Sequence, residues 1–355
     1  MTMRVVLAFD LEPVPRLPVQ SDGSHWDGFR ASVVLVRRLR EGLSRTQSVV
    51  PSFTWLVRMD PQIERVYGHF GWIAERFAAD LDELERDGDE IGLHTHLYRW
   101  DDGKSGNSRN PGNSGNSGKS GKSGWVTEYR SVEWMQHCVE GATRAYQATR
   151  SKAPRSHSFG DRYSSEQGIA TLDALGFDVD MTVEPGFVSL PSIYFGETLL
   201  GPLPDTSRAP RGLWRPSHED YLRDDPGTGR RLRLLPVTSY RFPRWMEPGR
   251  RVEHLVRRLR GEHPGQDEKL QGYARLSPSQ RGYVFRDGAR RAVADGGLRI
   301  LHVVLRVNQL LSAAASERVV ANLKWLAGGG LGEAAEFVSA SRLLDAVDGA
   351  GRDAG

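Results

Sequence analysis

The chain has 355 residues, of which 38% are hydrophobic and 26% are charged, and its formal net charge is only +3. This composition excludes a wholly disordered chain and provides enough apolar material for a sizeable core. Basic and acidic residues are nearly equal in number and intermixed, so nothing in the composition points to a nucleic-acid-binding surface. No stretch approaches the roughly 20 apolar residues of a membrane span.

The single cysteine, Cys138, excludes an intramolecular disulfide and a zinc site built from several cysteines. The apolar run at residues 5–9 is too short for the core of a secretory signal and is followed directly by an acidic residue. Both features are typical of a protein in a reducing compartment, so we predict that the protein is cytoplasmic.

Short apolar runs alternate with longer helical patterns from the N-terminus onward, which predicts βαβ units on a parallel sheet. About seven such alternations favour a closed or nearly closed barrel over two separate sheets. We therefore predict an α/β protein with a distorted or incomplete TIM-like (β/α) barrel, forming a single domain over residues 1–345. The predicted strands lie at residues 4–9, 52–57, 90–94, 178–183, 233–238, 298–307 and 336–339, and the predicted helices at 29–42, 71–87, 131–150, 167–176 and 317–327.

Three segments differ from this pattern. Residues 103–124 contain almost only Gly, Ser, Asn and Lys, so they cannot bury apolar surface and we predict a flexible loop, either a lid or a neutral insertion. The arginine-rich segment 250–260 is interrupted by apolar residues at helical spacing, which predicts an amphipathic helix with a solvated face. Residues 346–355 form a predicted disordered tail.

Two carboxylates follow the first predicted strand. In a parallel barrel the C-terminal ends of the strands converge on one face, and Asp10 lies at such an end. Glu12 lies two residues further, so both side chains point the same way if the chain stays extended. Such a pair suits a base beside a metal ligand. The alternative is that Asp10 begins a loop and Glu12 is exposed.

His94 and His96 lie at the end of the third predicted strand and share a side by the same two-residue spacing. Two neutral imidazoles and a carboxylate from another strand form the nitrogen and oxygen environment that zinc and related ions accept. The alternative is that the histidines are hydrogen-bonded core residues. With water at the remaining coordination position, such a site supports metal-assisted hydrolysis.

Several segments, taken in order, resemble the polysaccharide deacetylase family, also called the NodB-homology family. The resemblance begins with residues 9–12 (FDLE), 50–57 (VPSFTWLV) and 89–96 (DEIGLHTH). It continues through residues 159–163, 171–180, 214–217 and 235–239, and so covers nearly the whole chain. It implies a distorted barrel that uses a divalent metal, with Zn²⁺ as the ion that such ligands favour, to remove an N-acetyl or similar acyl group from a sugar.

The resemblance also implies roles for individual residues. Asp10 would be the catalytic base, and Glu12, His94 and His96 would hold the metal. The family usually carries adjacent aspartates in its first motif and histidines four residues apart in its second. Here Leu11 separates the acids and Tyr98 stands at the later histidine position, so which carboxylate binds the metal is open.

The late strand departs further from the family, because Arg306 stands where a histidine acts as general acid. Arginine stays protonated and cannot deliver a proton to a leaving amine. His302 shares a face with Arg306, but four residues of strand place it about 13 Å deeper, as a core histidine.

Four residues are predicted to bind substrate: Arg162, Tyr163, Trp214 and Arg306. A structural salt bridge for Arg162 and a core position for Trp214 are the alternatives. The predicted function is metal-dependent deacylation of a carbohydrate or glycoconjugate. Two other functions are compatible with the missing late histidine: a non-catalytic protein that binds a glycan or anionic sugar, with Arg306 as anchor, and hydrolysis of a small non-sugar amide.

Overall fold

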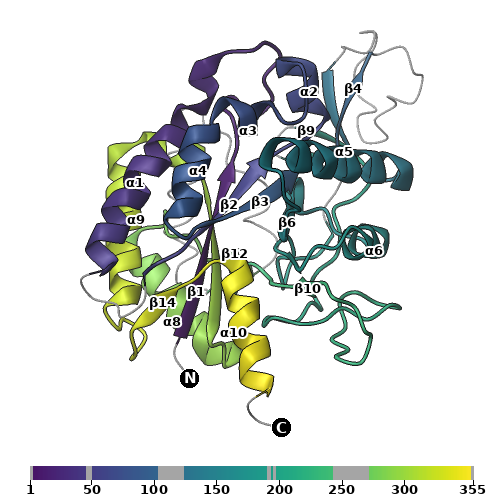
Figure 1. Ribbon diagram of the computed structural model, residues 1–355. Coiled ribbons are helices and arrows are strands. Elements are labelled where there is room, and N and C mark those ends of the chain that lie inside the picture. The colour runs from purple at the N-terminus through teal and green to yellow at the C-terminus, as the bar shows by residue number, and fades with distance from the viewer. Residues whose placement is uncertain are drawn as a thin grey trace, which may run out of the picture.

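The computed structural model describes residues 3–44, 50–102, 124–189, 193–194, 197–242 and 272–352 (Figure 1). Of the segment 103–124 only Gly124 is among the described residues, where it begins a strand. The predicted amphipathic helix 250–260 lies outside the described residues.

An eight-stranded sheet forms the centre of the fold, and every pairing between its strands is parallel. The strand order is β10-β7-β6-β3-β2-β1-β13, and β14 also pairs with β1. The incomplete α/β barrel predicted from the sequence is therefore confirmed. Its strands are β1 (Met3–Leu11), β2 (Thr54–Arg58), β3 (Glu90–Thr95), β6 (Ser156–Phe159), β7 (Val179–Asp180), β10 (Arg233–Leu234), β13 (Ile300–Arg306) and β14 (Ala335–Phe337).

The two end strands of this sheet approach each other without forming a full ladder. The Thr238 N–H donates to the His302 carbonyl at 2.8 Å, and the Thr238 hydroxyl accepts from the His302 N–H at 2.8 Å. Pro236 has no N–H to donate, which limits regular pairing just after β10. The barrel is thus joined at this edge by Thr238.

Alternate residues of the strands face two different cores. Val6 and Ala8 of β1 pack inside the curved sheet with Leu56 and Met181. Their neighbours along β1, such as Leu7, belong to the larger core between the sheet and the helices. The inner series of β1 continues by the same two-residue period to Asp10 and Glu12.

The outer layer consists of helices that cover the sheet (Figure 1). One predicted helix, 71–87, is divided at Phe77, whose φ of −116° is not helical. None of the described helices is long and apolar enough to cross a membrane. The helices of this layer are α1 (Asp27–Ser44), α2 (Pro61–Tyr67), α3 (Trp72–Arg76), α4 (Ala78–Arg86), α5 (Val132–Arg150), α6 (Glu166–Ala174), α8 (Gly282–Gly296) and α9 (Ala313–Ala327).

Helix α10 (Ala340–Arg352) lies at the N-terminal ends of the strands (Figure 1). Its Leu343 and Leu344 are buried in the inner core, and Val347 packs against the same core. The Ala340 N–H donates to the Thr54 hydroxyl at 3.0 Å. The helix therefore continues through much of the tail that we predicted to be disordered, because its apolar residues recur at helical spacing and have a core to contact.

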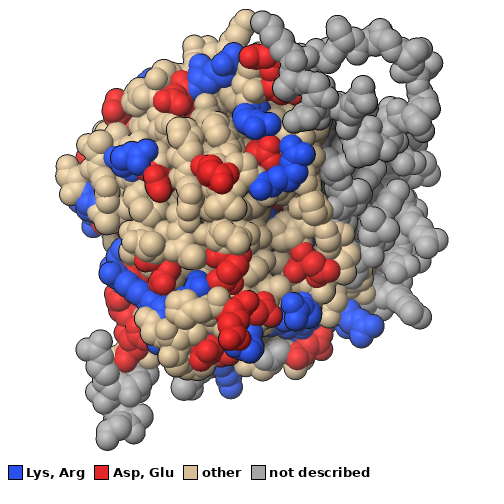
Figure 2. Space-filling model, turned by 90° about the vertical axis from the view of Figure 1, so that its right-hand side faces the viewer, with Lys and Arg blue, Asp and Glu red and all other residues tan. Residues whose placement is uncertain are grey.

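Two smaller sheets lie outside the barrel sheet. The first contains β4 (Tyr98–Asp101), β5 (Gly124–Glu128), β9 (Glu197–Leu200) and β8 (Ile193–Tyr194), and begins just after the predicted metal histidines. The second pairs β11 (Ser239–Arg241) with β12 (Tyr273–Arg275). On the face shown in Figure 2, acidic and basic side chains of the described residues lie among one another.

Candidate metal centre

The predicted metal ligands come from the ends of two parallel strands, β1 and β3, with β2 between them. Glu12 directly follows β1, His94 lies in β3, and His96 directly follows β3. Because both segments stay extended with the same two-residue period, all three side chains reach the inside of the barrel at the C-terminal ends of its strands.

The three side chains meet within hydrogen-bonding distance. The Nε2 atoms of His94 and His96 are 3.0 Å apart, and Glu12 Oε1 lies 3.4 Å from the first and 3.3 Å from the second. All three residues are buried, and one ligand atom from each lies within 4.8 Å of the others. The structure therefore brings together the set that the sequence predicted.

Asp161 orients one of the histidines. Its Oδ2 lies 3.0 Å from Nδ1 of His96, and its side chain is fully buried. A carboxylate accepts hydrogen bonds, so Nδ1 of His96 carries the proton and Nε2 keeps the lone pair that a metal needs. Two converging imidazoles, a carboxylate and this orienting acid fit a divalent ion of the zinc type.

The charges around the ligands favour their metal-binding forms. Burial acts to raise the pKa of Glu12, but Arg16, Arg306 and the two histidines outweigh it, and the pKa lies well below its usual range. Burial and the nearby Arg58 guanidinium hold the pKa of His96 well below its usual range. Glu12 is therefore a carboxylate and His96 a neutral imidazole, as metal ligands must be.

Asp10 is buried beside this set, and its Oδ1 has no hydrogen-bond partner among the described residues. Burial raises its pKa, while the charges of His94 and Arg306 act in the opposite direction. Arg306 is the register partner of Asp10 across β1 and β13, so both side chains lie on the inner face. Such a carboxylate is suited to accept a proton in the pocket.

Sequence reasoning missed two arginines that hold the ligands in place. Arg16 forms ion pairs with Asp161 and, at 3.6 Å, with Glu12. Arg58 is fully buried, pairs with Asp60 at 2.5 Å, and lies 5.2 Å from the centre of the Tyr98 ring. That ring stacks on His96 with centroids 4.7 Å apart. Arg58 is the last residue of β2, so the reasoning that identified Asp10 from its place at a strand end could also have identified Arg58.

The turn that carries Asp161 has an unusual backbone. Asp161 and Arg162 both adopt left-handed conformations, with φ of 55° and 60°. Each such residue costs roughly 1–2 kcal/mol when it has a Cβ. Sites that bind ligands often contain strain of this kind, held by the surrounding structure. The sequence gives only a weak signal for the turn, because aspartate adopts the left-handed conformation more readily than most residues but arginine does not.

A small cavity opens beside the candidate ligands. Its volume of about 30 Å³ has room for about one or two water molecules, which excludes a whole sugar ring. Asp10, Glu12 and His94 line one part of it, and Arg162, Arg275 and Arg306 line another. A space of this size admits small groups, such as an acyl carbonyl or a carboxylate, while the rest of a sugar would lie outside it.

The four residues predicted to contact substrate divide into two pairs. Arg162 and Arg306 line the cavity, and Arg162 also pairs with Glu184 at 3.5 Å. Tyr163 and Trp214 are not among the cavity-lining residues. Tyr163 packs in the core with its hydroxyl 2.8 Å from the Ser165 hydroxyl.

Trp214 is also a core residue, with its Nε1 donating to the Tyr221 carbonyl at 2.9 Å. For both aromatic residues the prediction of substrate contact is thus corrected, because their rings pack in the core and their polar atoms have partners. His302 is a core residue as predicted, being 1% exposed.

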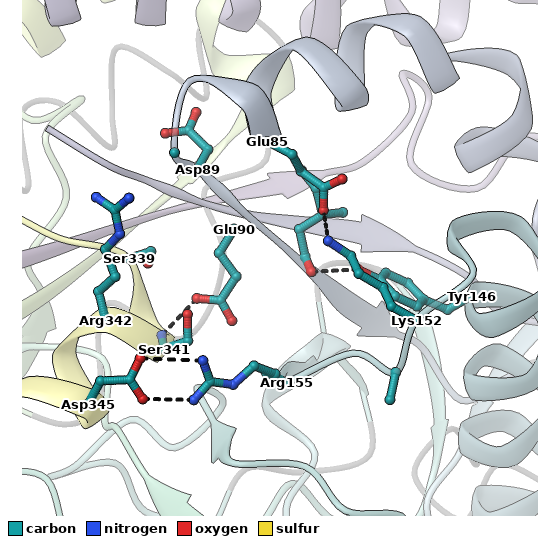
Figure 3. A pocket seen from close by; sticks show the side chains of 13 residues that line it. Glu85, Asp89, Glu90, Tyr146, Lys152, Arg155, Ser339, Ser341, Arg342 and Asp345 are labelled. Carbon is teal, nitrogen blue, oxygen red and sulfur yellow. Dashed lines mark hydrogen bonds and ion pairs between the residues drawn. The ribbon is translucent and has the colours of Figure 1, made fainter. Parts of the chain in front are cut away.

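A second, larger cavity of about 410 Å³ lies at the opposite end of the barrel (Figure 3). It is formed by α10 and the segments before β3 and β6. Its charged groups are largely matched: Arg155 meets Asp345 at 3.0 Å, Lys152 meets Glu85, and Glu90 accepts from the Ser341 N–H at 2.7 Å. These contacts attach α10 to the barrel.

No protein-family model and no curated protein sequence matches the chain. Solved structures with a similar chain path include a protein from Mycobacterium smegmatis assigned as a polysaccharide deacetylase, with 13% identity, a TM-score of 0.48, and coverage of 98% of this chain and 91% of that one. A protein from Parabacteroides distasonis assigned as a glycoside hydrolase or deacetylase has 12% identity, a TM-score of 0.49, and coverage of 95% and 70%.

The peptidoglycan deacetylase PdaC from Bacillus subtilis is similar over 99% of this chain and 95% of its own, with 7% identity and a TM-score of 0.40.

Proposed function

We propose that this protein is a metal-dependent hydrolase that removes an N-acetyl or related acyl group from a carbohydrate or glycoconjugate. The observation that supports this function is the buried convergence of Glu12, His94 and His96, with the Asp10 carboxylate beside them. Held by these three ligands, a divalent ion, with zinc as the first candidate, would lower the pKa of water and polarise an acyl carbonyl.

The chain's own residues then have defined tasks. Asp10 accepts a proton at Oδ1 as water attacks the carbonyl carbon, because this oxygen has no other partner among the described residues. Arg306, next to Asp10 across the sheet, provides a fixed positive charge for the oxygen that becomes negative. Arg306 cannot donate a proton, so the proton held by Asp10 is the one available to the leaving amine.

The cavity size determines how a substrate is placed. With about 30 Å³ available, the acyl carbonyl enters and the sugar lies across the opening. The arginines 162 and 306 that line the cavity are the proposed substrate contacts. The assignment of residues 1–345 to one domain and the cytoplasmic location stay predictions.

Two considerations favour the alternatives. The resemblance to the deacetylase family would place a histidine acting as general acid where Arg306 stands, which favours a protein that binds a glycan without cleaving it. The small cavity favours hydrolysis of a small non-sugar amide. Both alternatives use the same residues, so one experiment separates them from the proposed function.

The test combines metal analysis with an assay of acetate release from acetylated amino sugars. We expect about one divalent ion per chain, acetate release by the wild-type protein, and a loss of about 10²–10⁴-fold in kcat/KM for Asp10→Asn, with metal content unchanged. Asp27→Asn, at a side chain 51% exposed, is the matched control and should behave as wild type.

A folded protein that binds no divalent ion would overturn the proposed function. Bound metal without acetate release would favour the glycan-binding alternative, whereas release of acetate only from small amides would favour the other.

A further inference from the structure

Three arginines line the cavity beside the candidate ligands. Arg162 comes from the strained turn η2 (Gly160–Arg162), Arg275 ends β12, and Arg306 ends β13. Three elements far apart in the sequence therefore each direct one guanidinium to the same small space. A core that only needed filling would not gather such groups, because burial of a charge is costly.

The formal charges of the carboxylates and guanidiniums around this cavity sum to zero when no metal ion is bound. The carboxylates and guanidiniums that line the cavity or bridge its ligands are equal in number, so a divalent ion would leave an excess of positive charge in a largely buried space. An anion is the natural means of compensation. The groups counted are Asp10, Glu12, Asp161 and Glu184, and Arg16, Arg162, Arg275 and Arg306.

Two of the arginines are held side by side. Glu184 lies 2.9 Å from Arg275 and 3.5 Å from Arg162, so one carboxylate fixes both guanidiniums on the same wall. Arg162 is fixed further by the Phe187 ring, whose centroid lies 4.3 Å from its guanidinium carbon. A guanidinium presents its N–H groups as a planar fork, which matches the two oxygens of a carboxylate.

We propose that the substrate carries a carboxylate close to its acyl group, and that Arg162 and Arg275 bind this carboxylate. This inference rests on the proposed function and narrows its substrate to an N-acylated acidic sugar. Arg306 lies beside Asp10 and serves the reacting oxygen, whereas the Glu184-linked pair recognises the substrate's fixed charge.

The test measures binding and turnover separately with the metal-loaded protein. The ligands are N-acetylglucosamine and two carboxylated counterparts, one oxidised to the acid at C6 and one bearing a lactyl ether at O3. We expect at least one carboxylated sugar to bind about tenfold or more tightly than the neutral one, as a charge-assisted contact provides. The same sugar should show the higher kcat/KM.

Arg275→Gln should remove this preference and leave the affinity for the neutral sugar nearly unchanged. Arg130→Gln is the matched control, because Arg130 also pairs with a glutamate, Glu128 at 3.3 Å, but does not line the cavity.

Equal affinity for the neutral and both acidic sugars would overturn the inference and leave the proposed function intact. Absence of turnover with all three sugars would count against the proposed function. In that case the binding assay alone would decide the inference. A carboxylate preference that is lost in Arg275→Gln would support recognition of an acidic sugar. The lack of any such preference would refute it.

Discussion

The two ends of the barrel differ in the size of their cavities and in the arrangement of the charged side chains that line them. At the C-terminal ends of the strands, the cavity is small, and Asp10 has an oxygen without a hydrogen-bond partner among the described residues. At the N-terminal ends, the cavity is more than ten times larger, and ion pairs together with the Ser341 N–H at Glu90 match most of its charges, although Glu90 Oε1, like Asp10 Oδ1, has no hydrogen-bond partner among the described residues. Chemistry is therefore indicated by the convergence of Glu12, His94 and His96 at one end, rather than by single unsatisfied polar atoms or by the volume of a cavity.

The larger cavity is explained by the attachment of α10. Leu343 and Leu344 pack into the inner core at the N-terminal ends of the strands, and the polar groups around them fix the position of the helix. If this comparison is correct, changes at the N-terminal end affect stability and leave binding and catalysis unchanged.

The largest effect is expected for Leu343→Ala, because Leu343 is fully buried in the inner core. Removal of its side chain should lower the free energy of unfolding by about 2–5 kcal/mol, measured by urea denaturation. Metal affinity and acetate release per folded molecule should not change. The matched control is Leu311→Ala, at a side chain that is 51% exposed.

A loss below about 1 kcal/mol for Leu343→Ala would show that α10 does not stabilise the barrel. A loss of metal affinity in folded protein would show that the two ends are coupled.

An intermediate effect is expected for His302→Leu, halfway between the ends. Burial lowers the pKa of His302 to about 4, while the backbone carbonyls of Pro236 and Leu235 act in the opposite direction. The unfolded chain therefore binds the proton more readily between pH 6.5 and 4, and stability is lost as the pH falls through this window. His302→Leu should remove as much as about 3 kcal/mol of this acid-induced loss.

The measurement is the free energy of unfolding of wild type and variant at several pH values from 7 to 4, with the exposed His69→Leu as control. Identical pH profiles for His302→Leu and wild type would contradict the prediction. A loss of activity at neutral pH would instead place His302 among the functional residues and break the rule that we infer from the two ends.

The smallest effect is expected for Arg155→Ala. Arg155 pairs with Asp178 at 2.5 Å and with Asp345 at 3.0 Å, but its side chain is 44% exposed. Exposed ion pairs contribute about 0–1 kcal/mol, so thermal unfolding should change little. Arg30→Ala removes a comparably exposed pair elsewhere and is the control. A clearly larger loss than in this control would mean that the ion pairs, and not the buried leucines, hold α10.

The sequence alone was sufficient for the barrel and for the candidate ligands. Both follow from local periodicity: apolar runs mark buried strands, and a two-residue period places Asp10 with Glu12, and His94 with His96, on one side. Strand β6 was not predicted, because its residues Ser-His-Ser-Phe lack an apolar run and are buried only by the strands around them.

The tertiary structure decided which distant residues meet. Arg16 and Arg275 are separated from each other by most of the chain, and nothing in their local sequence shows that both serve one cavity. Tyr163 and Trp214 were predicted to contact substrate, yet their rings fill the core. Local patterns determine which face of the sheet a side chain occupies. The residues that it meets on that face depend on the curvature of the barrel, and this curvature is set by packing across the whole chain.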